Sequence, residues 1–279
     1  MKLIQILLQV EKAIVAGKFT LPALPAIAIQ VRKAVRDPLM DLSKLAKLVS
    51  LDPSFTAYLI NLANSPIYRG VASIDSIPLA LGRMGMESTR NSAMLFAIRS
   101  LFKTKNQLCK KLLNIVWEQS CRVSALSYVI AKNLKISDPE KASIAGLLHN
   151  VGLIPVLMKL VEQGESEQNI IEQWAEISRF SRKISVRVIA FWGLGEEIKA
   201  VTKGVGDWSI CHKEPLVDLI NLAIWHSYLG RTEFKQLPSL QTMGYFKNHS
   251  MSELDAGESL MFVKQSNQEI QQMMQALNG

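Results

Sequence analysis

The chain has 279 residues, of which 48% are hydrophobic and 20% are charged, and its formal net charge is +8. This apolar share is large enough to build a substantial core, which excludes an intrinsically disordered chain. No stretch reaches the ~18 uninterrupted apolar residues that a membrane helix requires. The apolar run at the N-terminus is broken by Gln5, Gln9 and Glu11, so it indicates an amphipathic helix rather than a signal peptide.

The cysteines indicate a reducing compartment. The chain has three of them, Cys109, Cys121 and Cys211, which is an odd number, and it has no Cys-x-x-Cys pair. Such a set predicts neither a disulfide framework nor a structural zinc knuckle. Together with the interrupted N-terminal run, it favours a cytoplasmic protein.

Charge is unevenly distributed along the chain. Residues 1–135 carry 19 Lys and Arg against 7 Asp and Glu, whereas residues 136–279 carry 13 against 17. A basic half can attract nucleic acid, anionic nucleotides or an acidic partner protein. No aromatic residues are interleaved with these charges to stack bases, and no nucleic-acid-binding motif accompanies them, so nucleic acid is not an expected partner.

Nearly every segment of the chain has apolar residues three and four positions apart, which is the periodicity of a helix. Alternating Val, Ile and Thr runs are nearly absent, and there is no Asn-Gly or Asp-Gly hairpin signal. The predicted fold class is therefore all-α. In chain order, we expect helices at residues 2–16, 24–36, 42–50, 53–64, 77–83, 87–103, 106–134, 139–160, 165–178, 182–192, 195–205, 214–229 and 252–277.

Aspartate followed by proline marks two of these helix starts. At Asp52 and Asp138, an apolar-periodic run follows the dipeptide at once. The aspartate side chain can accept a hydrogen bond from a free N–H group of the first turn, and proline has no N–H to lose there. Ser76, which lies two residues before a proline, predicts another start.

A polar stretch at residues 103–107 follows a long apolar run and predicts a border between two helical subdomains, 1–105 and 106–230. Beyond Gly230 the composition becomes polar, so residues 231–279 are expected to form an appended helical extension. Periodicity does not decide whether the apolar residues of this extension pack on the body of the protein or on a partner.

No familiar catalytic motif is evident. The sequence has no phosphate-binding Gly-rich loop with a lysine, no Gly-x-Ser-x-Gly elbow and no His-Glu-x-x-His helix. His149 has the most suggestive context, an apolar helix in which Ala145, Gly146 and Gly152 allow close packing. A lone histidine there is more often a hydrogen-bonded core residue than a metal ligand. Its neighbour Asn150 has a neutral amide, which is a weak ligand for a divalent ion.

Five stretches of the chain, taken in order, resemble one bacterial family. The most specific has the sequence LVSLDPSFTAYLINLANSPIY and begins at Leu48. Together they resemble the HDOD domain, a relative of the HD metal-dependent phosphohydrolases. The five stretches are residues 21–31, 48–68, 73–94, 145–157 and 188–198.

The resemblance implies an all-α HDOD fold, with an N-terminal helical bundle (1–105) packed on an HD-like helical core (106–230). In HD enzymes, a first histidine, a His-Asp pair and a later aspartate hold one or two metal ions. The resemblance places the pair at His149 and Asn150 and the first histidine near Gln119, so most of these ligands are lost.

The later histidines of some relatives fall in the stretch 203–208, where Asp207 is the only carboxylate. The resemblance therefore implies a degenerate metal site, in which Gln119, His149 and Asn150 line the former cleft as a candidate ligand-binding site. Plain packing in a polar cluster is the alternative interpretation of these three side chains. We expect no catalytic residue, no bound metal and no cofactor.

Two functions follow from the resemblance. The first is a non-catalytic, regulatory HDOD module of bacterial signal transduction, which binds a protein partner of its pathway or a small, nucleotide-like ligand. The alternative is a residual metal-dependent phosphohydrolase that acts on a nucleotide or a cyclic dinucleotide, and that needs a metal ion which few carboxylates are placed to hold. Neither function predicts association with a membrane.

A third hypothesis is that the basic N-terminal half of the chain binds a nucleotide or a nucleic acid. Arg69, Arg83 and Arg90 are candidate anion contacts, and Arg99 is a further one. The arginine guanidinium suits phosphate because it offers two parallel hydrogen bonds. Surface arginines without a ligand are far commoner, so a solvated surface is the competing interpretation.

Overall fold

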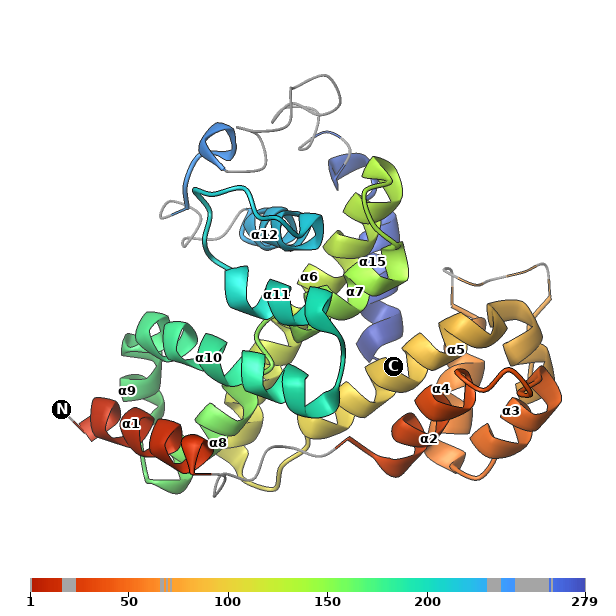
Figure 1. Ribbon diagram of the computed structural model, residues 1–279, viewed down its shortest axis with the longest axis horizontal. Helices are drawn as coiled ribbons and strands as arrows, with labels where there is room; N and C mark the ends of the chain where they lie inside the picture. Colours follow the sequence, from red (N-terminus) through yellow and green to blue (C-terminus); the bar gives the residue numbers. More distant parts are fainter. Residues whose placement is uncertain are drawn as a thin grey trace.

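A computed structural model of the chain describes residues 2–16, 24–65, 68, 70, 72–229, 237–243, 261 and 263–278. Within these residues every regular element is a helix, so the all-α prediction is confirmed (Figure 1). The described elements, in chain order, are α1 (Lys2–Val15), α2 (Ala26–Ala34), α3 (Leu42–Val49), α4 (Pro53–Ala63), α5 (Ile77–Leu101), α6 (Gln107–Leu134), α7 (Pro139–Leu148), α8 (Leu153–Glu162), α9 (Glu167–Glu172), α10 (Trp174–Trp192), α11 (Glu196–Gly204), α12 (Pro215–Ser227), the short 3-10 helix η2 (Leu240–Thr242) and α15 (Asn267–Asn278).

The first group of helices is built around α5. Helices α2, α3 and α4 pack on it, on the right in Figure 1. Asp52 begins α4 as predicted, because its carboxylate accepts a hydrogen bond from the backbone N–H of Phe55 at 2.9 Å. The rings of Phe55, Tyr58 and Phe96 form an aromatic cluster between α4 and α5. These rings pack α4 on α5, and the buried side chains of this group are part of the same hydrophobic core as those of the later helices.

Helix α5 joins two helices that the sequence predicts separately, at 77–83 and 87–103. Gly85 lies at the junction and has a φ of +80°, a conformation that glycine adopts without steric cost. Thr89 Oγ1 donates a hydrogen bond to the Gly85 carbonyl at 2.7 Å. The backbone of Gly85 is not helical, so α5 consists of two helical segments that meet at a kink, close to the two helices that the sequence predicts.

The second group of helices surrounds α6, which is 28 residues long. Helices α7, α8, α12 and α15 all contact it. Asp138 begins α7 as predicted, since its carboxylate accepts from the backbone N–H of Lys141 at 2.7 Å. Gly146 lies where α7 meets α6, and a Cβ there would lie 2.6 Å from Ser127 Oγ. A residue without a side chain therefore permits this close approach.

The sequence predicts one helix at 139–160, but the chain turns at residues 149–152, between α7 and α8. The turn allows α8 to pack on α10. Gly152 makes the closest contact, because a Cβ there would lie 2.2 Å from the Ser181 carbonyl oxygen, and its N–H donates to Ser185 Oγ at 2.8 Å. Tertiary packing therefore breaks a segment whose apolar periodicity is continuous.

The stretch Pro139–Glu162, which contains α7 and α8, is the one candidate membrane span among the described residues. It qualifies only by length and composition, and 78% of its apolar window is buried inside the protein. Both helices contact α6, so the apolar surface of this stretch is used for internal packing.

Helices from both ends of the chain lie on the second group. Helix α1 packs on α8, and α15 packs on α6 (Figure 1). The main contact of α1 is thus with α8 rather than with α2–α5. The sequence predicts α1 and α2–α5 in one subdomain, 1–105. The border near residue 105 remains a prediction. Most of the extension 231–279 lies outside the described residues.

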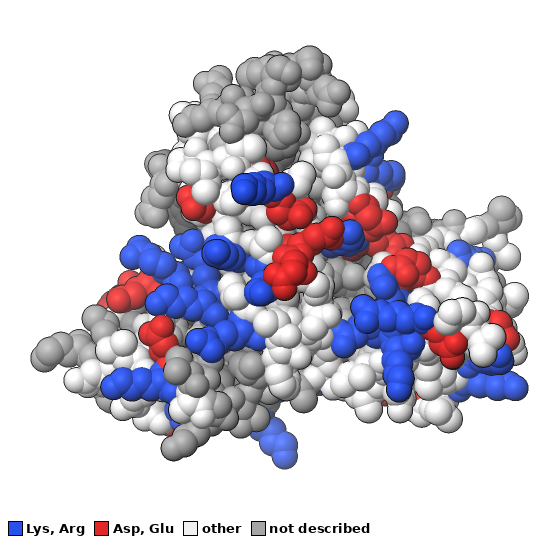
Figure 2. Space-filling model, viewed as in Figure 1, with Lys and Arg blue, Asp and Glu red and all other residues white. Residues whose placement is uncertain are grey.

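Charged side chains are grouped rather than mixed on the face shown in Figure 2. Lys and Arg gather over the α2–α5 end and again over the opposite end of this face. Asp and Glu gather between them. One basic patch on this face thus lies over α2–α5, from the first half of the sequence, and the other lies at the end where α9 and α10 are found, from the second half.

Gly152→Ala is expected to lower the free energy of unfolding by about 1–3 kcal/mol, because the added methyl group overlaps backbone atoms of α10. Gly82→Ala is the matched control on the exposed face of α5, where nothing lies within 4 Å of the Cβ position. It is expected to leave stability unchanged or to raise it, since alanine favours helix. Urea unfolding followed by circular dichroism measures both variants, and a Gly152→Ala protein as stable as the control would contradict the packing.

Candidate functional site

The three residues of the predicted cleft lie where α6, α7 and α12 meet. Gln119 and its neighbour Ser120 belong to α6, and His149 and Asn150 form the turn that follows α7. Ser227 is the last residue of α12. Two side-chain hydrogen bonds connect these elements.

Both amide side chains are bonded to serines. Gln119 Nε2 donates to Ser227 Oγ at 2.7 Å, which ties α6 to α12. Ser120 Oγ donates to Asn150 Oδ1 at 2.9 Å, which ties α6 to the turn after α7. Polar groups that are removed from water need such partners. The amides of Gln119 and Asn150 thus connect α6 with α12 and with the turn after α7.

His149 is a buried, neutral histidine. Its Nδ1 donates to the Gly146 carbonyl at 2.6 Å, which leaves Nε2 as the unprotonated ring nitrogen. Burial lowers the pKa of His149 to about 4, so the ring carries no charge at neutral pH. A histidine that ligates a metal also donates its other ring N–H to a carbonyl in this way. His149 therefore has the tautomer that a metal ligand would have. It is also buried and hydrogen-bonded, as predicted for a core histidine.

The metal site of HD enzymes does not fit the residues that surround His149. Within the described part of the chain, no three His, Cys, Asp or Glu side chains gather closely enough to hold a metal ion. A hydrolytic metal site takes about three protein ligands, mostly imidazole or carboxylate. Gln119 and Asn150 offer neutral amides instead, and both are engaged with serines.

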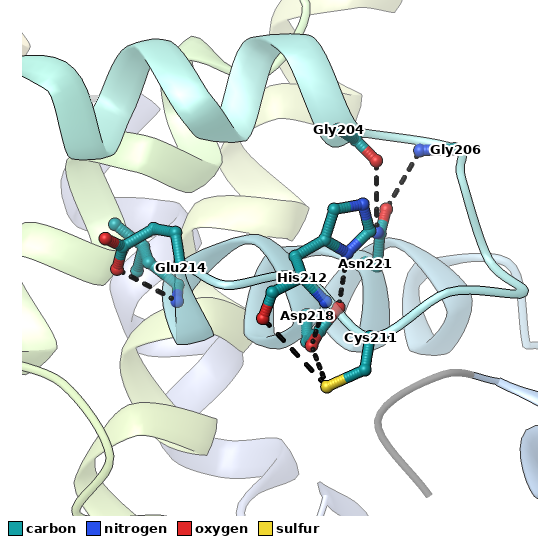
Figure 3. A network of polar contacts seen from close by, with 8 residues as sticks. Gly204, Gly206, Cys211, His212, Glu214, Asp218 and Asn221 are labelled. Carbon is teal, nitrogen blue, oxygen red and sulfur yellow. Dashed lines mark hydrogen bonds and ion pairs between the residues drawn. The ribbon is translucent and has the colours of Figure 1, made fainter. Parts of the chain in front are cut away.

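The stretch that the resemblance aligns with later histidines forms the turn after α11. Asn221 of α12 holds this turn, because it accepts from the Gly206 N–H at 2.9 Å and donates to the Gly204 carbonyl at 3.3 Å (Figure 3). Asp207 is exposed on the turn, and its backbone N–H also bonds to Gly204. The turn is therefore fixed by backbone contacts to one asparagine side chain.

Asp218 is a buried carboxylate that the sequence motifs do not reveal. It accepts hydrogen bonds from His212 Nδ1 at 2.6 Å, from the His212 backbone N–H at 3.1 Å and from Cys211 Sγ at 3.4 Å (Figure 3). A buried carboxylate requires such donors. The sequence signal for this contact is the helix start at Pro215. The chain turns there, so His212 before the helix meets Asp218 in its first turn.

This network holds the loop between α11 and α12. A cysteine nucleophile is activated by a histidine that takes its proton, whereas Cys211 donates to the carboxylate of Asp218. The His212 ring packs under the end of α11, since a Cβ on Gly204 would lie 2.9 Å from His212 Nε2. The geometry is that of a structural anchor.

The candidate arginines lie in different places. Arg83 donates to two backbone carbonyls, at 3.1 and 2.7 Å, and so closes the loop between α4 and α5. Arg90 lines a cleft of about 610 Å³ together with Arg32 and Arg36, which the sequence analysis does not single out. The signal for the latter two is their spacing of four residues, one helical turn. Arg69 lies outside the described residues.

Acidification is expected to destabilise the fold through His149. Its folded pKa of about 4 lies below the ordinary 6.5, so the unfolded chain binds more protons between these pH values. The contribution of His149 to the free energy of unfolding is fully present above about pH 6.5. It falls by about 3 kcal/mol as the pH decreases to about 4. Urea unfolding at pH 7 and pH 4.5 measures it. In His149→Gln, which cannot titrate, the decline should be smaller, and an equally steep decline would contradict the assignment.

Asp218→Asn is expected to lower the free energy of unfolding by about 3 kcal/mol, because an N–H group replaces one of the two oxygens that accept from buried donors. Asp207→Asn makes the same chemical change at an exposed position nearby. It is expected to shift stability by no more than about 0.5 kcal/mol. Equal thermal unfolding of the two variants would rule out a structural role for the network.

Comparison with known proteins places the chain among bacterial helical domains. The profile of the HDOD domain matches residues 21–197, which is more than half of the chain. A stretch of 161 residues is 26% identical to an uncharacterized protein from Treponema pallidum. That match covers 54% of this chain and 30% of the relative, so the chain spans less than a third of that protein.

Solved structures share the fold. A provisionally named metal-dependent phosphohydrolase from Shewanella amazonensis is 22% identical, with a TM-score of 0.77 and 99% of each chain covered. An HDOD domain protein of unknown function from Geobacter sulfurreducens is 21% identical, with a TM-score of 0.68 over 99% of this chain and 98% of that one. A provisionally named signal transduction protein from Marinobacter aquaeolei is 18% identical, with a TM-score of 0.61 over 95% of this chain and 61% of that one. The chain belongs to the HDOD domain family.

Proposed function

We propose that the chain is a non-catalytic regulatory module of bacterial signal transduction, located in the cytoplasm, which acts by binding a protein partner or a small ligand. Membership of the HDOD family supports a regulatory role, and the relative from Marinobacter aquaeolei is provisionally named a signal transduction protein. None of the three cysteines, all of which lie in the described part of the chain, forms a disulfide, which fits a reducing compartment.

The observation that carries this proposal is the use of both altered ligand positions as hydrogen-bonded links. Gln119 bonds to Ser227, and Asn150 bonds to Ser120. These bonds connect α6 to the end of α12 and to the turn after α7. In a phosphohydrolase, the same positions would present ionisable ligands to an ion that activates water. We infer that the former catalytic cleft has become part of the scaffold.

The proposal predicts that the protein retains almost no metal. Untagged protein is incubated with Mn²⁺, Fe²⁺, Zn²⁺ or Mg²⁺, desalted and analysed for bound ions. One imidazole and two neutral amides are too weak a ligand set to hold a divalent ion through desalting. Any phosphodiesterase signal on bis(p-nitrophenyl) phosphate should therefore be insensitive to a chelator.

The matched control is the double variant Gln119→His/Asn150→Asp, which puts an imidazole and a carboxylate back beside His149. It is expected to retain more metal than the wild type. A stoichiometric ion in the wild type, with chelator-sensitive hydrolysis of a cyclic dinucleotide, would support the residual phosphohydrolase and overturn the proposal.

A further inference from the structure

A cleft of about 610 Å³ lies between the two groups of helices. One wall belongs to α2 and α5, and the other to the start of α7 and the turn from α10 to α11. A cleft of this volume accommodates a ligand of nucleotide size. It is separate from the junction of α6, α7 and α12, because neither Gln119 nor Asn150 lines it.

Three arginines reach this cleft from one side. Arg32 belongs to α2, Arg36 follows that helix and Arg90 belongs to α5. Burial, and then the positive charges of Arg36 and Arg90, lowers the pKa of Arg32. The positive charges of Arg36 and Arg90 thus act on Arg32, with which they line the cleft, and a bound anion would offset that repulsion.

Four carboxylates line the cleft, and among the described residues Glu87 alone has an ion pair with one of these arginines. Asp138 caps α7, because it accepts from the backbone N–H of Lys141. Glu197 pairs with Lys141 at 2.7 Å, and Glu196 pairs at 3.1 Å with a lysine one turn along α11. Glu87 pairs with Arg90. Among the described residues, the three arginines thus share one carboxylate, so the α2–α5 wall keeps a positive excess.

Arg32 also joins the two walls. Its Nη1 donates to the Trp192 carbonyl at 2.6 Å, at the end of α10. A guanidinium has five N–H donors, so this bond fixes its position and leaves donors for a ligand. A ligand held by Arg32 would therefore bear on both groups of helices at their boundary.

We propose that this cleft binds a phosphorylated small molecule of nucleotide size, with its phosphate on Arg32, Arg36 and Arg90. Arginine matches phosphate through paired, charge-assisted hydrogen bonds. Met94 and Ile144 line the same cleft and offer apolar surface to the rest of the ligand.

The acidic wall defines the ligand further. Glu196 and Glu197 can accept hydrogen bonds from hydroxyl or amino groups, which a nucleotide carries at the end remote from its phosphates. The same wall repels a polyanion, which disfavours an extended nucleic acid. This ligand is a candidate for the small ligand of the proposed regulatory module. The binding itself is argued from the cleft, and only its role as a signal rests on the proposed function.

The test is calorimetric titration and thermal melting of the full chain with GDP, ADP, guanosine, adenosine and inorganic pyrophosphate. The nucleoside diphosphates should bind and raise Tm, and pyrophosphate should bind more weakly. The nucleosides, which lack phosphate, should not bind measurably. Arg36→Gln should weaken diphosphate binding about tenfold, and Arg36→Gln/Arg90→Gln about a hundredfold.

Lys33→Gln is the matched control, because it removes one positive charge from an exposed position on α2 that does not line the cleft. It should change the affinity by less than about twofold. If Lys33→Gln and Arg36→Gln lose the same amount of diphosphate affinity, the binding is general charge attraction, and the proposal is wrong. The proposal is also wrong if no phosphorylated probe gives heat or a Tm shift at millimolar concentration.

A preference for a single-stranded oligonucleotide over the nucleotides, with a steep salt dependence, would also overturn it. The outcome is distinguishable from that of the proposed function. Binding of a diphosphate that is hydrolysed only with metal leaves the cleft assignment standing and removes the non-catalytic function. If no phosphorylated probe binds and the protein retains no metal, the cleft assignment is wrong and the non-catalytic function stands.

Discussion

The close contact between α6 and α7 is the constraint on which the second group of helices depends. A Cβ on Gly146 would lie 3.0 Å from Ser124 Cα, so the two backbones approach more closely than side chains would allow. Ser124 Oγ donates to a backbone carbonyl of α7 at 2.8 Å within the same contact. This contact brings the turn after α7 beside the middle of α6, where Ser120 meets Asn150. The contact at Gly146 therefore helps to set where the turn at His149 and Asn150 lies on α6.

Neutral side chains suit that cleft better than charged ones would. An aspartate at position 150 without a metal ion would be a poorly solvated charge, whereas Asn150 keeps a similar shape and bonds to Ser120 without a charge. His149 is neutral for the same reason, because burial lowers its pKa to about 4. Asn150 and His149 are therefore both neutral, and neither needs a counter-ion at this site.

Polar contacts across the boundary connect the two groups of helices. Glu140, in the first turn of α7, accepts hydrogen bonds from Tyr68 Oη at 3.0 Å, from Ser88 Oγ at 2.5 Å and from Asn91 Nδ2 at 2.7 Å. Burial and the charge of Glu140 raise the pKa of Tyr68, so its hydroxyl remains a donor. Arg32 adds a bond to the end of α10 on the other side of the cleft. A ligand or partner that alters one of these contacts changes how the two groups are held, which is what a regulatory module requires.

The sequence by itself determined the all-α class, the aspartate-capped helix starts at Asp52 and Asp138, and the family. These features depend on neighbours within one or two turns, which periodicity and capping describe. Only the tertiary structure decided the break at Gly152, the burial of Asp218 against His212 and the meeting of arginines from α2 and α5 in one cleft. These depend on which distant surfaces pack together, and that is set by the summed contacts of whole helices rather than by any local pattern.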